Sequence, residues 1–192
     1  MRTQLSVYEK SFWDKQAALL TAMFPRLSEI VGMQFIVENL PLYLEKYPCD
    51  KNNNPELGRY YPKFLRQLEP IKKAPYLAEL ARFEWTYLMS KNKTQLISSL
   101  YPLHLKLHNK LKVKAGSLYN YALQPNQNKI IVHILTDFEY RLLHWFEPEV
   151  EITSILKRAA LLGYSENQVY TVMSSLKKRN LIESKFRYLE LA

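Results

Sequence analysis

Prolines interrupt a helical pattern of apolar residues in the first half of the chain, and they limit how long any helix there can be. Apolar residues recur at helical spacing over 11–23, where Pro25 ends the segment, and again over 27–47. Pro41 predicts a break of that second segment into two short helices. Further short helices are expected over 57–68 and from Pro75 onward. The pattern predicts a helical bundle over residues 1–95.

An exposed loop is expected at 48–55 within the helical half, and the pattern changes only after a polar boundary segment at 91–102 that ends in a proline. Residues 103–113 alternate apolar and basic side chains, which favours a half-exposed strand and leaves a helix open. Residues 124–128 are rich in turn formers, and the β-branched run 129–135 indicates a strand that forms a hairpin with 118–123.

Three helices are expected in the last third of the chain. Thr136 and Glu139 form a capping-box pattern, a second helix over 151–162 should stop at Gly163, and a third begins after Ser165. A wing-like strand should follow, with contributions from Phe186, Tyr188 and Leu189. We therefore expect a mainly α protein, with an N-terminal helical bundle at 1–95 and an α+β winged-helix-like domain at 96–192.

Composition favours a soluble cytoplasmic protein that does not enter a membrane. Cys49 is the single cysteine, and no stretch is long and apolar enough for a signal peptide or a membrane helix. The net charge of +9 invites a nucleic-acid interpretation. The basic surplus is four in residues 1–95 and five in residues 96–192, so neither half is a dedicated polycation.

The sequence shows no pattern of catalysis, metal binding or cofactor binding. The four glycines are isolated, which argues against a phosphate-binding loop. His104 and His108 are four residues apart but have no acidic residue between them, and His133 and His144 are expected to be structural. Glu147 and Glu149 flank a turn-forming proline and are expected to be solvated. We expect no enzyme activity and no cofactor.

The third helix of the last third carries the candidate binding residues. Side chains for base edges or a peptide are Asn167, Gln168, Thr171 and Ser174, and cations for phosphate are Lys177, Lys178 and Arg179. The cations lie only at the helix end, whereas DNA readers commonly contact bases with the N-terminal part, and a solvated helix end is the simpler alternative. The same element order resembles small domains that recognise leader peptides of ribosomally made, modified peptides, in which an extended peptide adds a strand to a sheet edge. Both uses remain open.

The N-terminal half carries a more specific resemblance, in five blocks of sequence. These blocks are Phe24-Pro25-Arg26-Leu27, Val31-Gly32-Met33-Gln34-Phe35, Tyr47-Pro48, Leu57-Gly58 with Phe64-Leu65, and the run from Pro75 to Trp85. Together they resemble the HvfC/BufC N-terminal domain family, long labelled a DNA-binding domain, over about residues 10–95. Phe24 and Phe83 replace residues that are commonly Tyr and Leu in that family.

The resemblance implies a partner role. Such proteins accompany multinuclear-iron, barrel-fold enzymes that oxidatively modify cysteines in small peptides, and the iron belongs to the enzyme. We therefore expect a non-catalytic subunit that binds this enzyme and its precursor peptide. A DNA-binding transcriptional regulator is the alternative, and an independent enzyme is a third hypothesis. Within the last block, Tyr76, Leu77, Leu80, Phe83 and Trp85 are expected in the core, and Arg82 and Glu84 in ion pairs.

Overall fold

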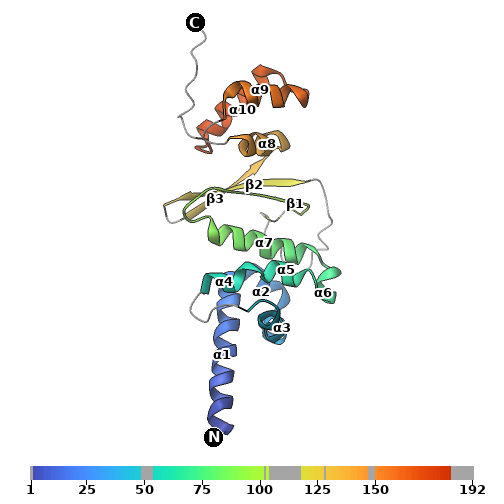
Figure 1. Ribbon diagram of the computed structural model, residues 1–192, viewed down its shortest axis with the longest axis vertical. Helices are drawn as coiled ribbons and strands as arrows, with labels where there is room; N and C mark the ends of the chain where they lie inside the picture. The colour runs from blue at the N-terminus through green and yellow to red at the C-terminus, as the bar shows by residue number, and fades with distance from the viewer. Residues whose placement is uncertain are drawn as a thin grey trace. The chain divides into compact units, whose positions relative to one another are not determined.

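The computed structural model describes residues 2–48, 54–101, 103, 118–127, 129–146 and 150–182. The chain divides into two compact units. The first unit is Met1–Ser90 with Ser99–Ser117, and the second unit is Lys91–Ser98 with Leu118–Ala192. Figure 1 marks the helices and strands along the chain.

The protein is mainly helical with a small antiparallel sheet, as the sequence predicts at this coarse level. None of the described helices is both long and apolar enough to cross a membrane. The helices of the first unit are α1 (Arg2–Met23), α2 (Pro25–Val31), α3 (Met33–Lys46), α4 (Asn54–Arg59), α5 (Tyr61–Leu65), α6 (Glu69–Lys72) and α7 (Tyr76–Met89).

The break between α2 and α3 lies at Gly32 and not at Pro41, which corrects the expectation from sequence. Gly32 adopts a φ of 80°, a conformation that only glycine reaches without steric cost, and α2 ends there. Pro41 lies inside α3, where it removes one backbone hydrogen bond without ending the helix. Pro25 is the first residue of α2, the position where proline costs a helix least.

Aromatic rings form the centre of the first unit. Phe24, Tyr43, Tyr61 and Phe64 are fully buried. The Tyr61 ring centroid lies 5.2 Å from that of Phe24 and 5.1 Å from that of Tyr43, and Tyr43 lies 5.2 Å from Phe64. Their contacts hold α3 and α5 to the start of α2.

The second unit contains the sheet, in the order β1 (Gln95–Ser99), β2 (Tyr119–Asn126) and β3 (Lys129–Leu135). The predicted hairpin is confirmed: β2 and β3 pair antiparallel from Asn126↔Lys129 to Asn120↔Leu135. The predicted turn at 124–128 was too long, because β2 continues to Asn126 and Gln127 takes the left-handed conformation at φ 52°. β1 lies where only a boundary segment was expected, and the strand expected at 103–113 lies outside the described residues apart from Leu103.

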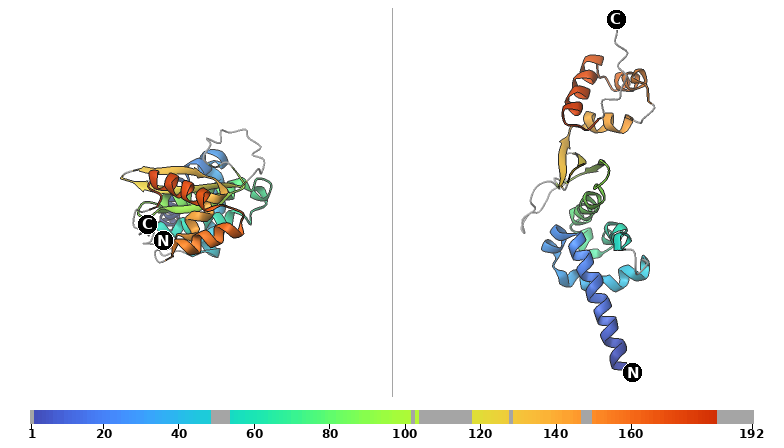
Figure 2. Two further views of the ribbon diagram at one scale, coloured as in Figure 1. Left: turned by 90° about the horizontal axis from the view of Figure 1, so that it is seen from above. Right: turned by 90° about the vertical axis from the view of Figure 1, so that its left-hand side faces the viewer.

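The three predicted helices of the second unit are also confirmed, as α8 (Asp137–Trp145), α9 (Ile152–Leu161) and α10 (Glu166–Lys178). Figure 2 (right) shows them gathered into one cluster. Thr136 and Ser165 cap α8 and α10 with complete capping boxes, and Gly163 follows α9 at φ 83°. Their core consists of Ala122, Leu135, Phe138, Leu142, Ile155, Ala159, Val169, Met173 and Leu176. The expected wing strand lies outside the described residues.

Candidate functional site

One face of α10 is polar and exposed. Asn167, Thr171, Ser174 and Lys178 follow one another at helical spacing and all face solvent. The opposite face, with Val169, Met173 and Leu176, is buried in the core of the second unit. The structure therefore brings four of the seven predicted site residues onto one exposed stripe, with a single cation at its C-terminal end.

Gln168 lies beside this stripe, but its side-chain carbonyl has a structural role. It accepts the backbone N–H of Ser165 at 2.8 Å, while Ser165 Oγ accepts the backbone N–H of Gln168 at 3.3 Å. Thr171 Oγ1 donates to the backbone carbonyl of Asn167 at 2.7 Å. Two of the side chains expected to contact a ligand thus also satisfy groups of their own helix.

Arg179 differs from the two lysines before it. Its guanidinium pairs with Glu139, the residue that accepts the backbone N–H of Thr136 at 2.7 Å in the cap of α8. The side chain of Arg179 is only 27% exposed. Lys177 and Lys178 are exposed. Arg179 therefore joins the end of α10 to the start of α8, a role that sequence spacing did not indicate.

A hydrogen-bond chain joins the hairpin to Asn180, the second residue after α10. Gln124 Nε2 donates to the backbone carbonyl of Asn180 at 2.7 Å, and its Oε1 accepts from His133 Nε2 at 2.9 Å. Burial, with the charge of Arg179 as a smaller cause, lowers the pKa of His133. The expectation of a structural histidine is confirmed for His133. His144 is exposed, and its Nδ1 lies 2.9 Å from the carbonyl of Tyr140 on the same helix.

In the part of the chain that the structure describes, β3 has a neighbouring strand on one side only. Pro125 has no N–H to donate, so its pair with Ile130 belongs to the set that forms no ladder hydrogen bonds. By alternation, Val132 and Ile134 belong to the same set, and the N–H and C=O groups of all three residues point away from β2. The sequence predicted the strand but not which of its residues point away from β2.

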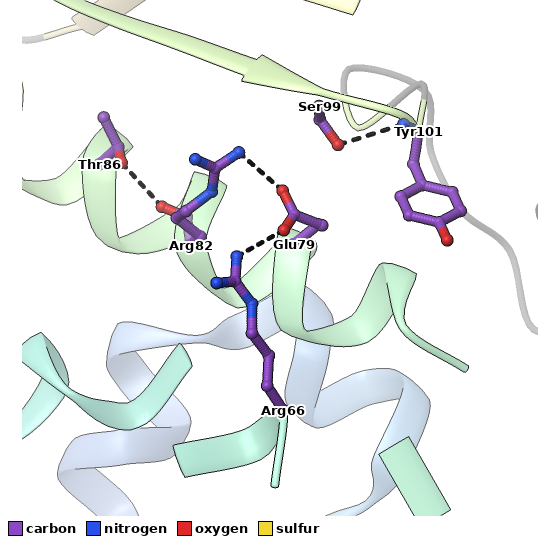
Figure 3. Close-up of polar contacts among 6 residues, drawn as sticks. All are labelled: Arg66, Glu79, Arg82, Thr86, Ser99 and Tyr101. Carbon is purple, nitrogen blue, oxygen red and sulfur yellow. Dashed lines mark hydrogen bonds and ion pairs between the residues drawn. The ribbon is translucent and has the colours of Figure 1, made fainter. Parts of the chain in front are cut away.

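The charged residues of α7 bind elements of the first unit. Glu79 bridges two arginines, with its carboxylate 2.6 Å from Arg66 and 2.7 Å from Arg82 (Figure 3). The ion pair expected for Arg82 is thereby confirmed. In the same view, Ser99 Oγ accepts the backbone N–H of Tyr101 at 3.1 Å.

The structure corrects the ion pair that was expected for Glu84. Its carboxylate accepts the backbone N–H groups of Arg26 at 2.8 Å and Leu27 at 3.2 Å, and so caps the first turn of α2. The residue is 7% exposed. Burial raises the pKa of Glu84 to about 7, although the two N–H bonds act in the opposite direction.

Gly58 and Trp85 come from two blocks of the family resemblance and are in direct contact. A Cβ at Gly58 would lie 2.5 Å and 2.7 Å from two atoms of the Trp85 ring. Leu77, Leu80 and Phe83 are buried as expected, whereas Tyr76 and Trp85 are half-buried. Two of the blocks that carry the resemblance thus contact each other within the first unit.

No set of three or more His, Cys, Asp or Glu side chains placed to hold a metal occurs among the described residues. His104, His108, Glu147 and Glu149 lie outside them. No protein-family model matches the chain, and neither a curated protein nor a solved structure does.

Proposed function

We propose that the chain is a non-catalytic subunit that binds a small precursor peptide and delivers it to a multinuclear-iron enzyme. The resemblance of residues 10–95 to partner proteins of such enzymes supports the enzyme side of this proposal. The peptide side is supported by the second unit, where the described hairpin and three helices follow the order that the sequence predicts for the first part of a winged-helix-like domain. DNA and peptide ligands are both known for that order of elements.

The observation that carries the peptide side is the outward edge of β3. The N–H and C=O groups of Ile130, Val132 and Ile134 can each bond to the backbone of an added strand. Apolar surface flanks this edge, since Ile131 is 38% exposed and Ile134 is 53% exposed. Backbone bonding supplies affinity and the flanking apolar side chains supply selectivity, which is the usual division in strand addition.

A substitution at the centre of this edge tests the proposal. Val132→Pro removes one outward N–H and places a ring where the peptide would lie, while the hairpin hydrogen bonds of β3 use other residues. We expect it to weaken binding of a fluorescent precursor peptide by about tenfold or more, as measured by anisotropy.

Val132→Thr is the matched control, because it keeps the N–H and a β-branched shape. It should bind within about twofold of the unsubstituted chain. Circular dichroism shows whether the proline variant keeps its hairpin and helices. A folded Val132→Pro variant that binds the peptide normally would contradict strand addition at β3.

The exposed stripe on α10 favours a second candidate, a DNA-binding transcriptional regulator. Asn167, Thr171 and Ser174 suit base edges and Lys178 suits a phosphate. Binding to duplex DNA that falls steeply with salt would favour it. The variant for this test replaces Lys177 and Lys178 with Ala and leaves Arg179, because Arg179 holds α8 and α10 together. Under the peptide proposal, this variant binds the iron enzyme as the unsubstituted chain does.

A further inference from the structure

Two tyrosines at the surface of the first unit stack on each other. Tyr47 follows α3, Tyr60 lies between α4 and α5, and their rings are 5.3 Å apart and nearly parallel. Tyr60 is 43% exposed, and the guanidinium of Arg59 lies 5.5 Å from its ring centroid. The stack therefore presents an aromatic surface that holds a cation in place.

Gln67 connects this stack to two lysines. Its amide nitrogen donates to the hydroxyl of Tyr47 at 3.1 Å and to the backbone carbonyl of Lys63 at 3.2 Å. Its amide oxygen accepts from the ammonium of Lys46. These contacts join one surface group, which comprises the side chains of Lys46, Tyr47, Arg59, Tyr60 and Gln67 and, through its backbone carbonyl, Lys63; we call it the tyrosine–lysine cluster.

The charge of this cluster is not neutralised by described parts of the fold. Lys46, Arg59 and Lys63 are exposed and form no ion pair with any described residue, in contrast to Arg66, which pairs with Glu79. Glu45 and Glu56 are near in sequence and exposed, yet neither pairs with these cations. Three exposed cations, of which Lys46 contacts Gln67 and Arg59 lies over the Tyr60 ring, are complementary to carboxylates.

We propose that the tyrosine–lysine cluster docks a carboxylate-rich segment of a protein partner. Lys46 is already positioned by Gln67, and Arg59 by Tyr60, so little side-chain freedom is lost when they bind a carboxylate. Tyrosine and arginine are also the residues most enriched where protein interfaces concentrate their binding energy. The proposal rests on the proposed function only for the identity of that partner, the iron enzyme.

The geometry favours a protein over a single-stranded nucleic acid. Nucleic-acid surfaces that combine cations with aromatic rings need an open ring face on which a base can stack. Here Tyr47 stacks on Tyr60, and Arg59 lies over the same ring. The Tyr60 ring already contacts Tyr47 and Arg59, whereas Lys46, Arg59 and Lys63 have no ion-pair partner among the described residues.

Fluorescence anisotropy with a labelled oligoglutamate peptide tests the proposal on the full chain. An oligothymidine of equal charge is the competing probe. We expect the oligoglutamate to bind more tightly than the oligothymidine, and the binding to weaken with salt. Replacing Lys46, Arg59 and Lys63 with Glu should weaken oligoglutamate binding by about tenfold or more.

The matched control replaces Lys73, Lys91 and Lys93 with Glu, since these are exposed and change the net charge equally. It should bind within about twofold of the unsubstituted chain. Arg59→Gln is a milder variant that leaves the fold least disturbed, and it should weaken binding by about threefold. Equal losses in both triple variants, or tighter binding of oligothymidine, would overturn the proposal.

The same variants separate this proposal from the proposed function. Precursor-peptide binding depends on β3, so the cluster variant should keep it. If the cluster variant loses oligoglutamate while the iron enzyme fails to co-purify with the unsubstituted chain, the docking surface stands and the proposed partner is wrong.

Discussion

The contact between Gly58 and Trp85 explains a glycine inside a helix, where alanine is ordinarily more stable by about 1 kcal/mol. The Trp85 ring occupies the space that a Cβ would need. Glycine is required here by packing, because Gly58 does not have a positive φ. A sequence pattern shows such a glycine but not the ring that requires it.

Gly58→Ala should lower the free energy of unfolding by about 1–2 kcal/mol, since overpacking costs more than the helix propensity gains. Urea unfolding measures it. In a Trp85→Leu background the same substitution should cost less, because the ring is gone. Equal costs in the two backgrounds would show that Trp85 is not the cause.

The raised pKa of Glu84 predicts that the free energy of unfolding depends on pH. Its pKa rises from 4.5 in the unfolded chain to about 7 in the fold, so the folded state binds the proton more tightly. The stability that this proton contributes is present below 4.5 and is lost as pH rises to about 7. Stability measured at several pH values should therefore fall across that window, and Glu84→Gln should flatten the fall. A slope unchanged by Glu84→Gln would rule this group out as its source.

At the scale of elements, local signals predicted the structure well where they were complete. Thr136 with Glu139, Ser165 and Gly163 marked the ends of α8, α9 and α10 because capping depends on neighbouring residues. The helix break predicted at Pro41 was wrong, because one lost hydrogen bond inside α3 does not end a helix that packs through Ile36, Leu40 and Tyr43. β1 was missed because its partner, β2, lies about twenty residues further along the chain.

Glu139 and Asp137, two acidic residues in the first turn of α8, should contribute unequally to the free energy of unfolding. Glu139 accepts the N–H of Thr136 and pairs with Arg179, whereas Asp137 pairs, among the described residues, with the exposed Arg141 alone. Glu139→Ala should lower the free energy of unfolding by about 1–2 kcal/mol, and Asp137→Ala by less than about 0.5 kcal/mol. Thermal unfolding compares them, and equal shifts would contradict a linking role for Glu139.

For the whole molecule, the sequence predicted two parts that differ in secondary structure. Each unit has its own set of buried residues. What the sequence could not predict were contacts between distant positions. The tyrosine–lysine cluster joins the end of α3 to residues near α5, and Glu84 caps a helix 57 residues away. Exposed residues such as Tyr60 and Lys63 carry no periodic signal, so only the fold reveals their grouping.

We propose that this chain acts by holding a peptide for another protein. The most direct test measures the mass of the precursor peptide after incubation with the chain alone, with the iron enzyme alone and with both. We expect a mass change that depends on the enzyme and increases when the chain is added, with none from the chain alone. A modified peptide produced by the purified chain without the enzyme would contradict it.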